Sequence, residues 1–336
     1  MRAAEQPGSR GDVRLPVRIL GTASVLPGRA VTTAELAREL GREPEELERK
    51  TGIRHRHWAP PGAKMAELGA QALGLALERA GLAATELRRI LFVTSTGGDA
   101  LVPATANRVA AALRLSGSCD AFDLNNACMG FLSAFDVAAR SVVTGLSPVA
   151  IVTVELNSRV ISPSDFRPYL VFGDAAAAAV LGPARVPAEG VLASVFGNDG
   201  THAPDTQLEH PLLTGHLEGV RFHTSSRDMV RVVFDVLDRA TSQVSECSGV
   251  RMSDIEWVLP HQPNGAMLHG IAERYGFEPA RLMPVVEEIG SVAAASIPFS
   301  LDRLLRTRPV RPGDRVLMLG VGAGVSYGAL LYQVGA

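Results

Sequence analysis

The stretch DLNNACMGF, residues 123–131, places a cysteine where a strand is expected to pass into a helix. Residues 119–124 have the composition of a short strand. Apolar residues recur at helical spacing over 130–144, and Gly145 follows as a helix stop. Cys128 is therefore predicted to stand at a helix N-terminus, where unpaired N–H groups and partial positive charge favour a thiolate. The plainer interpretation is a small buried residue at a helix start, and position alone does not decide between the two.

Strand-like and helix-like segments alternate on both sides of this stretch. Strands are predicted over 17–24, 89–94, 149–154, 175–181, 190–196, 255–259, 315–319 and 327–334, and helices over 33–40, 65–80, 103–113, 226–244, 265–275 and 293–305. Such alternation predicts an α/β fold with largely buried sheets. The second half repeats the pattern of the first, which suggests two related domains, residues 1–185 and 186–336. Identity between the halves is too low to prove a repeat.

The overall composition narrows the classes of function. A chain of 336 residues suggests about two core-forming units. The net charge of −2 gives no electrostatic case for nucleic acid. No run approaches the roughly 18 apolar residues of a membrane span. Three cysteines form no disulfide framework, and the polar tail 1–12, expected to be disordered, does not resemble a signal peptide, so a cytoplasmic location is expected.

Three segments of the second half supply groups that suit acyl transfer. PHQPN (260–264) places His261 at a predicted strand end and Asn264 at a helix N-cap, and IGSVAAASIP (289–298) is a loop that leads into a helix. The glycine-rich turn LGVGAGVSYG (319–328) joins two strands and can bring N–H groups close to a carbonyl. With Cys128, these segments offer a nucleophile, a proton carrier and oxyanion donors.

Each of these features also has a plain structural interpretation. A lone histidine is more often structural, and a glycine-rich turn is often only a tight hairpin. A phosphate-binding loop would need a following helix, whereas a strand follows here. Cys119 and Cys247 lack a catalytic context. The other histidines show no metal-ligand spacing with a carboxylate, so no metal is expected.

From about residue 18 to residue 333 the chain resembles β-ketoacyl-ACP synthase III and its relatives in the thiolase superfamily. The resemblance is carried by TGIR (51–54), NACMGF (126–131), FGDAAA (172–177), PHQ (260–262) and GAGVSYG (322–328). It implies a five-layer αβαβα thiolase fold with two pseudo-symmetric halves, and a homodimer. It also implies a ping-pong mechanism in which Cys128 takes an acyl group from CoA or an acyl carrier protein. Acyl-CoA or acyl-carrier phosphopantetheine is then a substrate, and no cofactor is expected.

One departure from the family concerns decarboxylation. Decarboxylating members carry an asparagine in an IGNTSAAS-like segment, and its amide acts with the histidine on the malonyl thioester carbonyl. Ser291 stands at that position here. Loss of one donor in comparable oxyanion sites costs about 100- to 1000-fold in rate. Ser291 can also be interpreted as the N-cap of the following helix, and the two roles are compatible.

Two further departures concern recognition of the acyl donor. A family arginine that follows the histidine segment is Ala266 here, and a family tryptophan near the CoA adenine is Glu46. Lys50 keeps a positive charge beside TGIR. Lys50, Arg54 and Asn264 are the residues predicted to bind CoA or the carrier.

The sequence therefore predicts a ketosynthase III-like acyltransferase of specialised metabolism, such as polyketide biosynthesis. Cys128 would be acylated, with the oxyanion between the N–H groups of Cys128 and Ala323. His261 would act as general base or hydrogen-bond donor, and Ser291 would mark weakened decarboxylation. The acceptor would be a hydroxyl, an amine or a thiol.

Two other functions stay open. One is a decarboxylating or Claisen-type synthase that forms a C–C bond, in which Ser291, a water, Asn125, Asn126 or Asn264 replaces the missing amide. The other is a catalytically silent partner subunit of a heterodimeric synthase, against which the presence of Cys128 and His261 argues. The substrate pocket is expected to be bordered by 198–227, by 161–169 and by residues 101–103 of a partner chain.

Overall fold

The computed structural model describes residues 14–210, 213, 215, 222–224 and 229–335. The tail expected to be disordered (1–12) and the first residues of the helix predicted at 226–244 lie outside the described residues. Within this part of the chain, no helix is long and apolar enough to span a membrane.

The elements of the two halves follow one another with short connections. In the first half they are β1 (Val17–Val25), β2 (Arg29–Thr32), α1 (Thr33–Leu40), α2 (Pro44–Thr51), β3 (His55–Trp58), α3 (Met65–Ala80), η1 (Ala84–Glu86), β4 (Arg89–Val93), α4 (Thr105–Ala112), β5 (Asp120–Leu124), α5 (Gly130–Val143), β6 (Val149–Leu156), η2 (Asn157–Arg159), α6 (Phe166–Val171) and β7 (Asp174–Pro183). In the second half they are β8 (Gly190–Asn198), η3 (Gly200–Asp205), β9 (Thr206–Leu208), β10 (Phe222–Thr224), α8 (Met229–Ser248), η4 (Met252–Asp254), β11 (Trp257–Pro260), α9 (Gly265–Tyr275), η5 (Pro279–Arg281), α10 (Val286–Ile289), η6 (Ala293–Ala295), α11 (Ser296–Thr307), β12 (Arg315–Gly322) and β13 (Ser326–Gln333).

The two large sheets have the same internal order. The first runs β1-β7-β6-β4-β5, with β4 parallel to β5 and β6 and with β7 antiparallel to β6 and β1. The second runs β8-β13-β12-β11, with β11 parallel to β12 and β13 antiparallel to both of its neighbours. On the outer side of β11, Leu282 forms a parallel bridge with Val258. This bridge occupies the position in the second sheet that β5 occupies in the first. The pseudo-symmetry is therefore a property of the topology, whereas the exact domain boundary at 185/186 stays a prediction.

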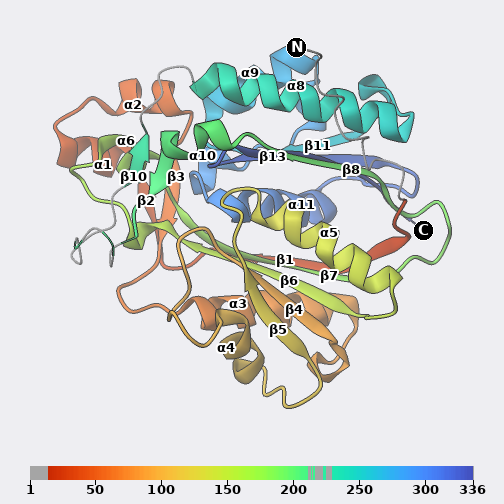
Figure 1. The fold of residues 1–336 in the computed structure, drawn as a ribbon. Coiled ribbons are helices and arrows are strands. Elements are labelled where there is room, and N and C mark those ends of the chain that lie inside the picture. Colours follow the sequence, from red (N-terminus) through yellow and green to blue (C-terminus); the bar gives the residue numbers. More distant parts are fainter. Residues whose placement is uncertain (1–13, 211–212, 214, 216–221, 225–228, 336) are drawn as a thin grey trace, which may run out of the picture.

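Five layers are stacked in the molecule (Figure 1). Helices α3 and α4 cover the outer face of the first sheet, and α8 and α9 cover the outer face of the second. Between the sheets lie α5 and α11. Strand β6 is buried along its whole length, and so are the five alanines of β7 (175–179). Burial between two helix layers overrides the usual preference of alanine for helices.

Local signals in the sequence explain most helix ends. Helix α1 begins with a capping box between Thr32 and Glu35, and α3 ends at Gly81 in the left-handed conformation. These predictions are confirmed within one or two residues. The antiparallel pair of strands β2 and β3, and the helices α2 and α6, were not predicted, because these elements are too short to show a clear period. The α-helix predicted from residue 293 begins at Ser296 after a 3₁₀ turn, and its N-cap is Ala295.

A buried carboxylate ties the central helix α11 to the first half. Asp302 accepts hydrogen bonds from the hydroxyls of Thr22 and Ser24 on β1, at 3.0 and 2.6 Å. It also forms ion pairs with Arg79 of α3 and Arg306 of α11. Asp302 is fully buried, so these four partners compensate the cost of removing its charge from water.

Candidate active site

The nucleophile candidate lies in the tight turn between β5 and α5. Cys128 directly precedes Met129, the N-cap of α5, and follows Ala127, whose φ of +44° is left-handed. Among the described residues, the N–H of Cys128 has no carbonyl acceptor. A Cβ atom added to Gly322 would lie 3.1 Å from this nitrogen, so glycine is needed for the β12–β13 turn to approach the cysteine.

The protonation states of the two catalytic candidates are set mainly by burial. Surrounding protein, and secondarily the charge of Glu155, raise the pKa of Cys128 to about 12. Burial lowers the pKa of His261 to about 4. These shifts favour a neutral thiol at Cys128 and a neutral imidazole at His261 at neutral pH, rather than the resting thiolate predicted from the helix N-terminus. A neutral imidazole can accept the thiol proton during attack.

His261 lies at the end of β11 and is held by its backbone. Its N–H donates to Leu319 O of β12 at 2.7 Å, and only 5% of the residue is exposed. Within the described residues its Nδ1 is buried without a hydrogen-bond partner. Because buried polar atoms normally have partners, this nitrogen is available for a substrate or a reacting group.

Gln262 links the histidine segment to the loop before α11. Its N–H donates to Ser296 Oγ at 3.1 Å, and its Nε2 donates to Met283 O at 2.8 Å. Its Oε1 accepts from the N–H groups of Val285 and Val286. The side-chain amide thus binds the segment 283–286 and Ser300 of α11, while the main-chain N–H binds Ser296 at the start of α11.

Ser291 is fixed by its main chain. Its N–H donates to Val171 O at 2.7 Å, and its carbonyl accepts from Gly173 N at 2.9 Å, which forms a parallel bridge with Phe172. Ser291 is buried, and its hydroxyl has no hydrogen-bond partner within the described part of the chain. It caps neither η6 nor α11, so the N-cap interpretation of this residue is wrong.

The segments converge on the start of α5. A Cβ atom added to Gly130 would lie 3.7 Å from the Cβ of Ala294, which places the Ser291 loop beside the nucleophile turn. The β12–β13 turn lies on the other side, through Gly322. The N–H of Ala323 in that turn has no carbonyl acceptor among the described residues. The N–H groups of Cys128 and Ala323 thus both lack a carbonyl acceptor among the described residues, and their role as oxyanion donors stays a prediction.

The predicted donor-binding residues share one region of the surface. Gly52, between Lys50 and Arg54, packs directly on Gly265 at the start of α9, next to Asn264. Lys50 forms an ion pair with Glu46, so its charge is partly neutralised by the residue that replaces the family tryptophan. The other two side chains also have partners: Arg54 pairs with Glu287 at 3.3 Å, and the Oδ1 of Asn264 caps α9 by accepting from Met267 N. Binding of CoA by these residues stays a prediction.

The asparagines considered as substitutes for the missing amide have local roles. Asn126 donates through Nδ2 to Ser133 Oγ at 2.9 Å. Asn125 accepts from Ala127 N through its Oδ1, and Asn264 is the α9 cap. The Nδ2 group of Asn126, at least, is already used within α5.

A buried acid near the nucleophile was missed by the sequence analysis. Glu155, at the end of β6, is fully buried, and burial raises its pKa to about 8. The sequence contains a clue to this residue, because Glu155 is the single charged residue in the apolar run VAIVTVEL (149–156). A charge in a strand buried on both faces calls for a specific reason.

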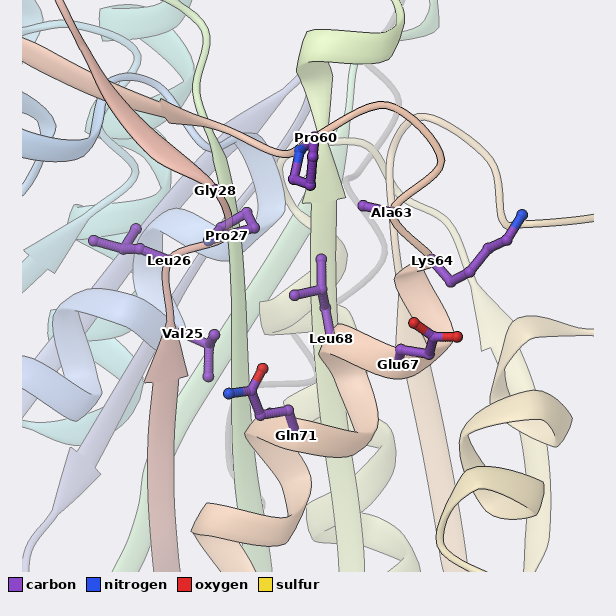
Figure 2. A pocket seen from close by; sticks show the side chains of 10 residues that line it. All are labelled: Val25, Leu26, Pro27, Gly28, Pro60, Ala63, Lys64, Glu67, Leu68 and Gln71. Carbon is purple, nitrogen blue, oxygen red and sulfur yellow. The ribbon is translucent and has the colours of Figure 1, made fainter.

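A surface pocket of about 420 Å³ lies elsewhere, between the end of β1 and the start of α3 (Figure 2). Leu68 and Gln71 of α3 line it, while the ammonium of Lys64 points outward. Cys128, His261 and Ser291 do not line this pocket. Within the described residues, no group of three or more His, Cys, Asp or Glu residues could hold a metal ion.

Comparison with known families and structures accounts for this arrangement. The family model 3-oxoacyl-[acyl-carrier-protein (ACP)] synthase III matches residues 122–200, and the model of its C-terminal part matches residues 246–334. The priming β-ketosynthase from the R1128 polyketide biosynthetic pathway is 31% identical with a TM-score of 0.88, covering 98% of this chain and 99% of its own.

Two further structures are similar over nearly their whole length. 3-Oxoacyl-(acyl carrier protein) synthase III from Pseudomonas aeruginosa is 28% identical with a TM-score of 0.87, and covers 96% of this chain and 99% of its own. The enzyme from Thermus thermophilus is 30% identical with a TM-score of 0.86, and covers 95% and 99%. The chain therefore belongs to the 3-oxoacyl-[acyl-carrier-protein] synthase III family, a family of transferases, and has its thiolase fold.

Proposed function

Given this family membership, we propose that the protein is a cysteine acyltransferase that takes an acyl group from acyl-CoA or an acyl carrier protein. Cys128 Sγ attacks the thioester carbonyl while neutral His261 accepts the thiol proton. The N–H groups of Cys128 and Ala323 stabilise the oxyanion. The intermediate collapses to acyl-Cys128, and the departing thiolate of CoA or phosphopantetheine takes the proton from His261.

The second half-reaction transfers the acyl group without loss of CO₂. His261 accepts the proton of a hydroxyl, amine or thiol acceptor, which attacks the acyl-Cys128 carbonyl, and Cys128 leaves with that proton. The observation that carries this proposal is Ser291. Its backbone is held by the bridge to Phe172, and its side chain ends at Oγ, one bond short of the position of an asparagine amide nitrogen, so the hydroxyl is a poor substitute for that amide.

A decarboxylating, C–C bond-forming synthase is the second candidate. It is favoured by the relatives, because the similar structures carry the names of synthases and of a priming β-ketosynthase. In that case the hydroxyl of Ser291, which has no partner among the described residues, would donate to the enolate together with His261.

A homodimer in the cytoplasm is also proposed. β5 is an edge strand of the first sheet, and the side chains of Leu101 and Val102 are 80% and 84% exposed. An edge strand beside exposed apolar residues suits pairing with a second copy. A role in specialised metabolism is supported by the likeness to the priming β-ketosynthase of a polyketide pathway.

Intact-protein mass spectrometry with a panel of acyl-CoA and acyl-carrier donors, malonyl donors included, tests the proposal. A malonyl adduct on Cys128 that persists without CO₂ loss supports acyl transfer. A simple acyl adduct that malonyl-carrier discharges with release of CO₂ supports the synthase and overturns the first proposal. The Cys128→Ala variant is the control for the modified position.

A further inference from the structure

The two helices of the middle layer begin in the same way. Ala127, with φ of +44°, stands three residues before Gly130, the first residue of α5. Ala293, with φ of +43°, stands three residues before Ser296, the first residue of α11. Since the two sheets also share their strand order, Ala294 is the counterpart of Cys128 in the second half.

The N–H groups of these two counterparts differ in what they bind. The N–H of Cys128 has no carbonyl acceptor among the described residues, whereas the N–H of Ala294 donates to Glu155 Oε1 at 3.3 Å. The same oxygen accepts from Ser95 N at 2.9 Å, and Oε2 accepts from Thr94 Oγ1 at 3.3 Å. Glu155 therefore joins the end of β4 to the loop that carries Ser291.

Glu155 lacks the usual compensation for a buried acid. Its partners within the described residues are N–H groups and hydroxyls, with no arginine, lysine or histidine. A buried carboxyl group without a cation is costly, so an apolar residue here would favour stability. Its retention beside the nucleophile points to a role in the reaction.

We propose that Glu155 is a positioning residue of the active site, which anchors the Ser291 loop against the nucleophile's sheet and whose negative charge opposes formation of the Cys128 thiolate. This inference rests on the proposed role of Cys128 as the nucleophile. Ionisation of Glu155 would then reduce the reactivity of Cys128, and a neutral Glu155 would permit it.

The residues that contact Glu155 in the described part of the chain do not titrate, so Cys128 is the titratable group whose pKa its charge changes. The β4 end contributes Thr94 and Ser95, η6 contributes Ala294, and Ala175 of β7 faces Glu155 in register. The pKa of Cys128 is raised by the charge of Glu155 after burial, and no other residue's charge contributes to that shift. The shift of His261 comes from burial alone.

Alkylation of Cys128 by iodoacetamide measures its thiolate without any acyl donor. The sulfur forms a bond to the reagent's methylene carbon, iodide leaves, and the thiol proton passes to water. The chain has three cysteines, so the Cys119→Ser/Cys247→Ser background leaves Cys128 as the single thiol. The rate is followed by intact mass across pH 6–10.

Glu155→Gln keeps the Oε1 acceptor and removes the charge. Because the pKa of Cys128 lies above this pH range, we expect the alkylation rate at pH 10, where Glu155 of the parent is ionised, to rise about tenfold, which corresponds to a fall of about one unit in that pKa. The matched control is Asp174→Asn, because Asp174 is also a buried carboxyl whose pKa is raised by burial but it binds Ala59 and Ser158 instead. An unchanged alkylation rate at pH 10 in Glu155→Gln, or an equal rise in Asp174→Asn, would overturn the inference.

Glu155→Asp tests the positioning role separately and also serves if the glutamine variant does not fold. It keeps the charge but shortens the reach to Ala294 N and Ser95 N. The alkylation rate at pH 10 should stay within about twofold of the parent, while kcat for acylation falls about tenfold with little change in KM. Unchanged kcat would remove the positioning role. Absence of any alkylation or acylation at Cys128 in the parent would instead overturn the proposed function.

Discussion

The turns before α5 and α11 use one backbone conformation for two purposes. Both follow a left-handed alanine, and both lie in the middle layer between the sheets. In the first half the turn carries Cys128, whose N–H has no carbonyl acceptor among the described residues, while in the second half it carries Ala294, whose N–H is bound to Glu155. The comparison teaches that the fold supplies the donor geometry twice, and that the acceptor decides whether it anchors a loop or serves catalysis.

The strand ends next to these turns show the same division. At the end of β4, Thr94 and Ser95 bind Glu155. At the end of β11, His261 keeps an unpartnered Nδ1, and Gln262 holds the surrounding loops. At the end of β4 the polar groups are therefore bound to a buried carboxyl, whereas at the end of β11 a buried ring nitrogen is left without a partner among the described residues.

The largest expected effect is on the rate of acyl transfer, and it comes from making the turn before α5 like the turn before α11. Cys128→Ala gives the first turn the side chain of Ala294 and should lower acyl transfer by at least about 10⁴-fold, because no nucleophile remains. Loss of the acyl adduct in intact-mass spectra checks this. Cys119→Ala is the control and should keep the adduct, and an adduct that survives in Cys128→Ala would contradict the mechanism.

The tie between the halves can be broken at Asp302. Asp302→Ala leaves two arginines and two hydroxyls without their buried acceptor, and should lower the free energy of unfolding by about 3–5 kcal/mol. Urea unfolding measures the loss. Asp254→Ala removes an exposed partner of Arg251 and should leave the urea midpoint unchanged. Equal midpoints for the two variants would show that Asp302 contributes little.

A substitution at Ser291 tests whether the loop before α11 determines malonyl decarboxylation. Ser291→Asn places an amide in the loop before α11, where the decarboxylating relatives carry one, and should raise malonyl decarboxylation by about 100-fold if the donor is what is missing. Release of CO₂ from malonyl-carrier is the measurement, with Ser291→Ala as the control that removes the hydroxyl. Equal rates in the three proteins would rule out residue 291 as the determinant of decarboxylation.

The smallest effect concerns stability and pH. Burial raises the pKa of Glu155 from an ordinary 4.5 to about 8, so the unfolded chain releases this proton before the folded protein does. The folded state therefore loses stability as pH rises from 4.5 to 8, and the loss is constant above 8. Glu155→Gln removes this cost, so its Tm relative to the parent should rise by about 5 °C between pH 5 and pH 8. A Tm difference that does not change with pH would contradict the assignment.

Most helices and strands could be predicted from the sequence, because apolar periodicity and helix-ending glycines depend only on neighbouring residues. Apolar periodicity and the glycine stops gave α3 and α9, and the strand-to-helix turn placed Cys128 before α5. His261 at a strand end and the glycine-rich turn with Ala323 were also located correctly within the fold. The resemblance to the family supplied the five layers, which no local pattern contains.

The tertiary structure alone decided how these groups behave. Glu155 meets Ala294 across 139 residues of chain, and Ser291 is held by a bridge to Phe172 instead of capping a helix. The pKa of Cys128 follows the same rule, because burial and the nearby charge of Glu155 outweigh the helix N-terminus. The sequence by itself determined which residues are present and which elements carry them. Dielectric surroundings and long-range hydrogen bonds exist only once the chain is folded, so protonation and loop positions were decided there.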